Sequence, residues 1–168
     1  MICDSYLLDH RALALKSVFT DGFKSKIITT HGIYYSKLSA EDLLNKACIC
    51  YFSTKKGREQ ASKLLLNYIQ KPPFLISNVN IGAVPTTGSN NFDCVWIFNH
   101  RCTVKEVAKG QSIVTFVNGT SITVNVSKHT ISSQLHRLHT LISYSQSIHR
   151  ERELYIEMSD SGRIRKSL

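Results

Sequence analysis

The stretch that decides the fold reads Ile113-Val-Thr-Phe-Val117, then Asn118-Gly119, then Thr120-Ser-Ile-Thr-Val-Asn-Val126. Two runs rich in β-branched residues flank an Asn-Gly pair, which is the strongest short-range signal for a β-hairpin. A two-residue type I′ turn needs positive φ at both central residues, and Asn and Gly tolerate this best. Such a turn fixes the register and predicts that three pairs share the core face: Val117 with Thr120, Thr115 with Ile122, and Ile113 with Val124.

After Val126 the spacing of apolar residues changes from two to a helical period. Four residues form a stripe along one side of this expected helix: Ile131, Leu135, Leu138 and Ile142. Either Ser127 or Thr130 can cap its start. The stripe allows two interpretations. It packs on the sheet beneath the hairpin, or it forms a subunit contact that Leu141 and Tyr144 widen on one side.

The rest of the chain is typical of short strands with tight turns. We expect helices over residues 39–44 and 58–68, because Ser39 starts a capping-box pattern and Pro72-Pro73 cannot continue the second helix. The expected strands cover residues 12–19, 26–29, 33–35, 47–52, 74–76, 81–85, 94–98 and 102–107. The sequence therefore predicts a single α+β domain, mainly of antiparallel strands and hairpins, with two to three helices including the one after the Asn118-Gly119 hairpin. We place this domain at residues 1–155 and a loose basic tail at residues 156–168.

Charge is the main functional hint in the composition. The 168-residue chain has a formal net charge of +9. Residues 53–110 hold eight Lys and Arg against three acids, and residues 127–168 hold seven against four. A basic protein attracts nucleic acid or an anionic membrane, and a solvated basic surface without a charged partner is the alternative.

Several classes of protein are disfavoured by the sequence. It has no run of about 18 apolar residues that would indicate a membrane span, and its start lacks the pattern of a signal peptide. We therefore expect a cytoplasmic protein without a membrane partner. The five cysteines are odd in number and irregularly spaced, which favours reduced thiols over a disulfide framework.

The residues that could bind a metal or perform catalysis form no strong pattern. The paired ligands of a structural zinc site are not evident among Cys48, Cys50, Cys94, His100 and Cys102. Phosphate-binding Gly loops and the motifs of zinc proteases and serine hydrolases are missing from the sequence. We expect no metal, no other cofactor and no enzymatic activity.

Basic side chains gather before and along the helix expected at residues 58–68. Between residues 54 and 92, Glu59 is the only acid against five basic residues: Lys55, Lys56, Arg58, Lys63 and Lys71. This pattern indicates either a surface that contacts phosphate groups or a solvated helix face.

Six short motifs follow one another along the chain. They are Cys50-Tyr51-Phe52 before Gly57-Arg58, Lys71-Pro72-Pro73-Phe74, Val84-Pro85-Thr86, Cys94-x-Trp96-Ile97, Val104-Lys105-Glu106, and Thr115-Phe116-x-Asn118-Gly119 running into Val124-x-Val126-Ser127. None of them is specific alone. Together, in order and approximate spacing, they resemble the ComK family of competence transcription factors of Gram-positive bacteria, from about Tyr6 to about Ser143.

The resemblance implies a function and partners. It implies a sequence-specific DNA-binding activator of DNA-uptake genes, which acts on the nucleoid as a dimer or higher homo-oligomer. It also implies binding to AT-rich dyad boxes in double-stranded DNA, mainly through the minor groove. RNA polymerase and a proteolytic adaptor are further implied partners, although only Leu154-Tyr155-Ile156 stands where some members carry a tail motif rich in Phe, Leu, Tyr and Pro.

The candidate DNA-binding residues come from two sources. Arg58, Lys71 and Lys105 are the basic residues that match the family motifs, and local charge adds Lys55, Lys56, Arg101 and Arg137. A·T pairs narrow the minor groove and deepen its negative potential, which attracts Arg and Lys. The competing hypothesis is a protein-interaction module or a metal-bearing protein that does not bind DNA.

Overall fold

The computed structural model describes the backbone of residues 8–166 and the side chains of residues 8–160. The elements are β1 (Ala12–Thr20), β2 (Phe23–Thr29), β3 (Gly32–Ser36), α1 (Ala40–Ile49), α2 (Lys55–Leu66), β4 (Phe74–Leu75), β5 (Gly82–Pro85), β6 (Val95–Phe98), β7 (Cys102–Ala108), β8 (Gln111–Phe116), β9 (Ser121–Val124) and α3 (Lys128–Lys166). The described strands form a six-stranded sheet in the order β3-β2-β1-β6-β5-β4 and a three-stranded sheet in the order β7-β8-β9. All the paired strands are antiparallel, so the predicted α+β class is confirmed.

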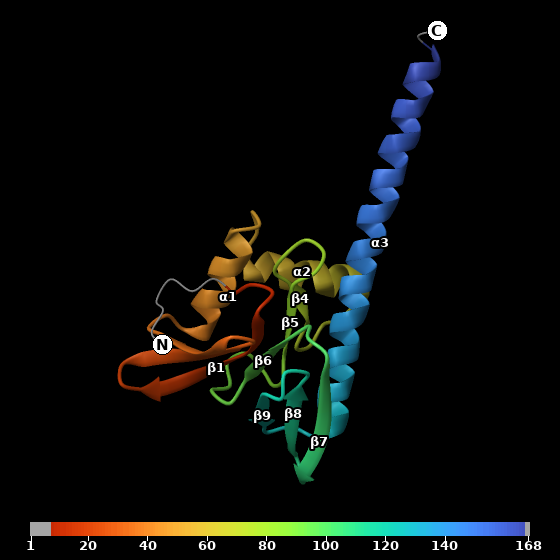
Figure 1. The fold of residues 1–168 in the computed structure, drawn as a ribbon. Coiled ribbons are helices and arrows are strands. Elements are labelled where there is room, and N and C mark those ends of the chain that lie inside the picture. Colours follow the sequence, from red (N-terminus) through yellow and green to blue (C-terminus); the bar gives the residue numbers. More distant parts are fainter. Residues whose placement is uncertain (1–7, 167–168) are drawn as a thin grey trace.

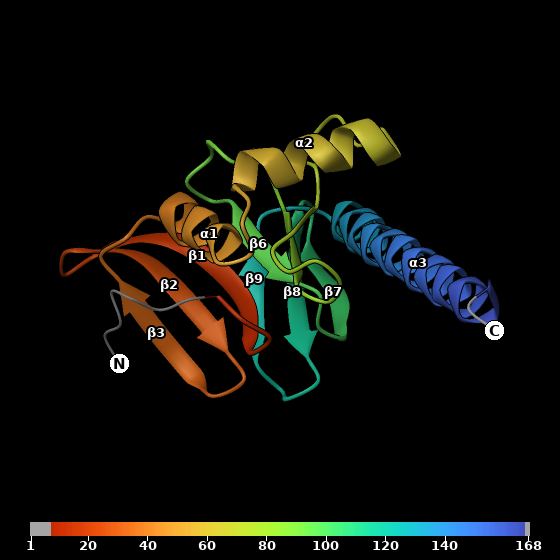
Figure 2. The same cartoon turned by 90° about the horizontal axis from the view of Figure 1, so that it is seen from above.

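The centre of the six-stranded sheet is buried on both faces. Ala12-Leu-Ala-Leu15 in β1 and Val95-Trp-Ile-Phe98 in β6 are continuous apolar runs with every residue buried. One set of their side chains, including Leu15 and Trp96, packs with α1. The other set, including Leu13 and Ile97, packs with β8, β9 and α3. Figures 1 and 2 show the resulting arrangement, with α1 on one side of the sheet and the three-stranded sheet with α3 on the other.

The predicted hairpin exists, but the predicted turn type is wrong, and the predicted register differs from the observed one by one residue. Of Asn118 and Gly119, only Gly119 has a positive φ, +85°, and its N–H donates to the carbonyl of Phe116 at 2.9 Å. This is a type I turn closed by a glycine bulge, which gives a three-residue loop rather than a two-residue one. The extra residue pairs Thr115 with Ser121 and Ile113 with Thr123.

The register change exchanges the two faces of β8. Ser112, Val114 and Phe116 are buried, whereas Ile113 and Thr115 point to the outer side. In β9 the buried residues remain Ile122 and Val124, as predicted. A slip of one residue turns every side chain of a strand to the opposite face, because the side-chain period is two.

A second correction concerns residues 47–52, which are not a strand. They form the end of α1 and the turn after it, in which Phe52 has a φ of +58° and the N–H of Ser53 donates to the carbonyl of Cys48. Leu43, Leu44, Ala47 and Cys48 form one buried helical face against the sheet. Burial of this face outweighs the β-propensity of Cys-Ile-Cys-Tyr-Phe.

The helix after the hairpin is confirmed, and its stripe packs on the sheet. Ser127 caps the start, since its Oγ accepts from the Thr130 N–H at 3.2 Å. Ile131, Leu138 and Ile142 belong to the core, so the first interpretation of the stripe holds. Leu141 is also buried in this core, at 5% exposure, and is not a free rim residue.

The helix is longer than expected. α3 has 39 residues and continues through Lys166, so residues 156–166 are helical, while the boundary proposed at residue 155 stays a prediction. Within the described part of the chain, no helix combines the length and the apolarity that a membrane crossing requires.

The hairpin geometry makes a stability prediction. Gly119→Val should lower the free energy of unfolding by roughly 1–3 kcal/mol, because a β-branched residue is strained at positive φ. Asn118→Ala is the matched control and should cost less, since Asn118 has no positive φ and loses only its Oδ1 bond to the Thr120 N–H. Urea unfolding of both variants measures the difference. Equal losses would contradict the assigned turn.

Candidate nucleic-acid interface

The seven predicted DNA-binding residues lie in three separate places. Lys55, Lys56 and Arg58 begin α2, Lys71 and Arg137 meet where the chain passes from α2 to β4 beneath α3, and Arg101 and Lys105 lie at β7. The structure therefore does not gather them on one surface. Each place has its own geometry, and the three differ in how much charge they present to solvent.

Lys55 is buried, and two carboxylates balance the positive charge of its ammonium group. Its side chain is 4% exposed, and its Nζ lies 2.6 Å from Glu59 Oε1 and 3.1 Å from Glu41 Oε1. The ammonium also lies 5.4 Å from the centre of the Phe74 ring. Burial alone would lower the pKa of Lys55, but the hydrogen bonds and charges of Glu59 and Glu41 raise it above its usual value. The ammonium thus joins α1 to α2 and does not face a DNA backbone.

The neighbouring basic residues of α2 are more accessible. Lys56 is exposed, and Arg58 is half-buried. Arg58 Nη2 donates to Asn78 Oδ1 at 2.9 Å, which leaves part of the guanidinium free of this bond. Thr54 caps the helix by accepting from the Gly57 N–H at 3.0 Å. Lys56 is therefore the first residue of this group that can meet a phosphate without breaking a contact.

Lys71 and Arg137 belong to a structural junction. Arg137 Nη1 donates to Gln134 Oε1 at 2.6 Å, and its guanidinium stacks over Tyr68 with 4.4 Å between Cζ and the ring centre. Gln134 is buried and donates to the carbonyls of Lys71 and Pro85. Burial lowers the pKa of Arg137 from its usual value, against a smaller opposing effect of Tyr68. Arg137 thus anchors α3 to the segment around Lys71.

The outer face of β7-β8-β9 is the most open of the three places. Arg101 precedes β7, and Arg101 and Lys105 are both exposed. Lys105 pairs with Ile113, which pairs with Thr123, so these three form one row across the sheet. The next row is Thr103, Thr115 and Ser121, and the Thr115 and Ser121 hydroxyls lie 2.9 Å apart. We call these rows together with Arg101 the outer face of the small sheet.

The sequence analysis missed the Thr115 hydroxyl of this face, because the one-residue error in the hairpin register assigned Thr115 to the core. The alternation of apolar and polar residues in Cys102-Thr103-Val104-Lys105 is a sequence signal that could have found this face.

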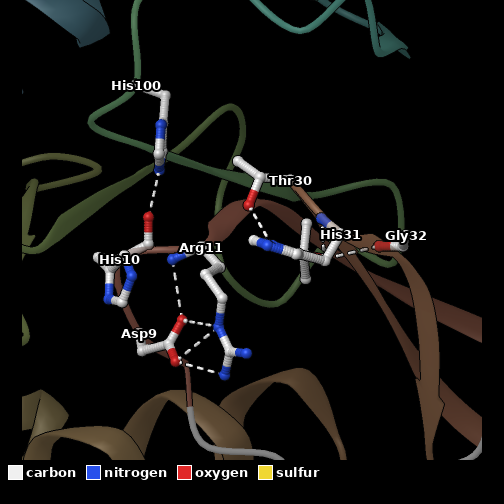
Figure 3. A network of polar contacts seen from close by, with 8 residues as sticks. Asp9, His10, Arg11, Thr30, His31, Gly32 and His100 are labelled. Atoms are coloured by element: carbon white, nitrogen blue, oxygen red, sulfur yellow. Dashed lines mark hydrogen bonds and ion pairs between the residues drawn. The ribbon is translucent and has the colours of Figure 1, made fainter.

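A polar network links the segment before β1 to the segment before β7 (Figure 3). His100 shares a 2.8 Å hydrogen bond with the carbonyl of His10, and Arg11 makes several contacts with the Asp9 carboxylate, the shortest at 2.7 Å. Burial acts to raise the pKa of Asp9, but the hydrogen bonds and charge of Arg11 hold it below its usual value. The Asp9 carboxylate therefore balances the charge of Arg11. Arg101, which follows His100 in the chain, is exposed.

Two of the four described cysteines have the features of core residues. Cys48, Cys50, Cys94 and Cys102 are free thiols, and Cys48 and Cys94 are buried in the main core. Burial raises the pKa of Cys48 to about 11, although Arg58 and Lys55 act in the opposite direction. Among the described side chains, no three His, Cys, Asp or Glu residues are placed to hold a metal ion.

The two adjacent lysines of α2 provide a matched test of this site. Lys55→Met keeps the length of the side chain but removes the hydrogen bonds to Glu41 and Glu59, and should lower the free energy of unfolding by roughly 1–3 kcal/mol. Lys56→Met removes the same charge from an exposed position and should leave stability within about 0.5 kcal/mol. Chemical denaturation followed by circular dichroism compares them. Equal stability of the two variants would contradict the buried ion network.

Comparison with known proteins identifies the family to which the chain belongs. No solved structure matches the chain. A curated relative, the "Competence transcription factor" of Bacillus subtilis (strain 168), is 26% identical over 137 residues, which cover 80% of this chain and 71% of that protein. The family model described as "ComK protein" matches residues 3–151. The chain therefore belongs to the ComK family.

Proposed function

We propose that this protein is a sequence-specific DNA-binding activator of competence genes, the genes for DNA uptake. Membership of the ComK family and the name of the Bacillus subtilis relative support a regulator of transcription in competence. The family is one of transcription factors rather than of enzymes. We further propose that the protein acts in the cytoplasm, at the nucleoid.

The observation that carries the DNA-binding proposal is the outer face of the small sheet. It combines two exposed cations, Arg101 and Lys105, with hydroxyl groups from three adjacent strands. Cations contact phosphates and supply most of the affinity, whereas hydroxyls donate and accept hydrogen bonds at phosphates or base edges. Sheets of other DNA-binding proteins dock strands into either groove. This combination supports a sheet that docks on duplex DNA.

We propose that docking occurs mainly in the minor groove of AT-rich boxes. Both A·T and T·A pairs present only acceptors there, and Arg, Lys and hydroxyl groups are donors. The narrow groove of A-tracts also attracts cations such as Arg101 and Lys105. Dyad boxes mirror a twofold protein, so the active species in this proposal is a homodimer or a higher homo-oligomer.

The remaining predicted residues have different roles in this proposal. Lys56 and the part of Arg58 outside its bond to Asn78 can contact the DNA backbone flanking the box. Lys55 and Arg137 act through the fold, and Lys71 contributes its backbone carbonyl to the junction with Arg137. RNA polymerase is the further partner that activation requires. A proteolytic adaptor remains a proposed partner through the segment that contains Leu154-Tyr155-Ile156, which is exposed in the structure.

The alternative from another class is a protein-interaction module without DNA binding. One observation favours it: α2 and the residues after it expose Leu64, Leu65 and Ile69 at 76%, 56% and 66%. Apolar side chains that cluster on a surface often mark a protein contact. A protein contact at Leu64, Leu65 and Ile69 would leave the outer face of the small sheet free, so an experiment can separate the two functions.

A mobility-shift titration at two salt concentrations tests the proposal. An AT-rich dyad duplex should bind more tightly than a GC-rich duplex of equal length. Arg101→Ala with Lys105→Ala should weaken binding to both and reduce the slope of log K against log salt by about two, since roughly one unit is lost for each phosphate contact.

The control for this titration removes the same net charge elsewhere. Lys24→Ala with Lys46→Ala changes two exposed lysines on β2 and α1, and should leave the slope nearly unchanged. Equal slopes for the two double variants would remove the outer face as the interface. If the native protein binds neither duplex even at low salt, the DNA proposal fails and the interaction module takes its place.

A further inference from the structure

The second half of α3 projects away from the body of the protein (Figure 1). Ser145 and Gln146 still donate hydrogen bonds to the carbonyls of Asn78 and Val79. From Arg150 to Met158, however, every residue is exposed. A single helix in water is only marginally stable at this length, and most helices in proteins depend on burial of an apolar face. The projecting segment therefore needs a partner.

An apolar groove lies at the base of this segment, between α2 and α3. Its apolar lining includes Leu65 of α2 with Leu141, Tyr144 and Ile148 of α3. Two polar atoms at the groove, Arg58 Nε and Ser62 Oγ, are buried without a hydrogen-bond partner among the described residues. Buried polar atoms are normally satisfied. The groove thus offers an occupant both apolar contact and unused hydrogen-bonding capacity.

The apolar residues of the groove continue along α3 into the projecting segment. Leu141, Tyr144, Ile148, Tyr155 and Met158 are spaced as the a and d positions of successive heptads, and Glu151 occupies the remaining position. A narrow seam with a period of 3.5 is typical of paired helices. Tyr155 and Met158 are 74% and 75% exposed, so this part of the seam is uncovered in the single chain.

We infer that two copies of this chain pair through antiparallel α3 helices, so that the projecting segment of each copy packs at the α2–α3 groove of the other. A twofold axis between residues 149 and 150 brings three pairs together. It places Met158 of the partner subunit over the groove floor, to which the buried Leu141 belongs, Tyr144 against Tyr155 of the partner subunit, and Ile148 against Glu151 of the partner subunit. Each pair occurs twice, as a twofold interface requires.

The self-complementary register identifies a second copy as the occupant. α3 carries both residues of the groove and the exposed seam residues. A single twofold axis aligns the seam of one copy with the groove of the other. The hydroxyl of Tyr155 of the partner subunit brings a hydrogen-bonding group to the groove that holds Arg58 Nε and Ser62 Oγ. This match follows from the sequence of α3 itself and is not expected for an unrelated helix.

Glu151 is the one charged residue of the seam. A polar residue at such a position fixes the register of a helix pair and lowers its stability. Replacing Glu151 by Leu should therefore strengthen the helix pair, whereas a disruptive substitution should weaken it.

The pairing deepens the proposed function, and its role at dyad boxes rests on that function. The pairing gives the twofold symmetry that a dyad box needs. It does not involve the outer face of the small sheet, which stays available for DNA. Self-association can be measured without DNA, so failure of the pairing and failure of the DNA-binding proposal are distinguishable.

Sedimentation of the full chain tests the pairing. The native protein should form a dimer, and Tyr155→Glu should raise the dimer dissociation constant by at least about 30-fold, as expected for a central interface residue. Ile156→Glu is the matched control, since Ile156 is a large exposed side chain next to Tyr155, 58% exposed and outside the seam, and it should have little effect. Glu151→Leu should lower the dissociation constant. Circular dichroism confirms that the variants stay folded.

Cross-linking tests the direction of the helices. In a chain with Tyr144→Cys and Tyr155→Cys, the two introduced thiols lie roughly 16 Å apart along one helix, too far for a disulfide within a chain. Antiparallel pairing predicts a disulfide between position 144 of one chain and position 155 of the other. Peptide mass spectrometry identifies the linked positions, with the unsubstituted protein as the control for its own cysteines.

Three results would overturn the inference. They are a monomeric native protein at micromolar concentration, equal effects of Tyr155→Glu and Ile156→Glu on association, and cross-links only between identical positions. A monomer that still binds the AT-rich dyad would reject the pairing while leaving the DNA-binding proposal intact.

Discussion

The structure depends on the need to cover both faces of β1 and β6. Four consecutive buried apolar residues in each strand cannot leave either face in water, since each fully buried large side chain contributes about 1.5–3 kcal/mol. α1 covers one face, and the small sheet with the first half of α3 covers the other. Gly82 lies at a close approach on the second side, where a Cβ atom would lie 2.9 Å from Leu138 Cδ1 and 3.1 Å from the Phe74 carbonyl oxygen, so a larger residue would force a shift.

The same constraint decides which basic residues are available to a ligand. Covering the first face brings α2 against α1, and Lys55 then lies between two carboxylates. Fixing α3 over the second face uses Arg137 and the backbone of Lys71. The small sheet has only one face in the core, so its other face keeps Arg101 and Lys105 exposed. Charge alone cannot separate these cases, because burial and pairing depend on tertiary contacts.

The sequence predicted most of the fold because its strongest signals are local. The spacing from Ile131 to Ile142 and the apolar run before Phe98 both identify elements that the structure contains. Errors arose where a local signal permits two outcomes. Asn118-Gly119 suits either a two-residue turn or a type I turn with a bulge, and the choice reverses the faces of β8. The segment after Ala47 has β-propensity, but its helical face is the one that meets the core.

α3 shows how one helix can meet two different demands. Up to Ile142 its apolar stripe is wide, as a helix that covers a sheet requires, and Gln134 fixes its position through two backbone carbonyls. Beyond Ile148 the heptad positions Tyr155 and Met158 lie exposed, with the exposed Leu154 and Ile156 beside them. A wide stripe suits a broad surface within one chain, whereas a narrow seam suits a single opposing helix. The change occurs where α3 leaves the body, which is where its own chain can no longer cover it.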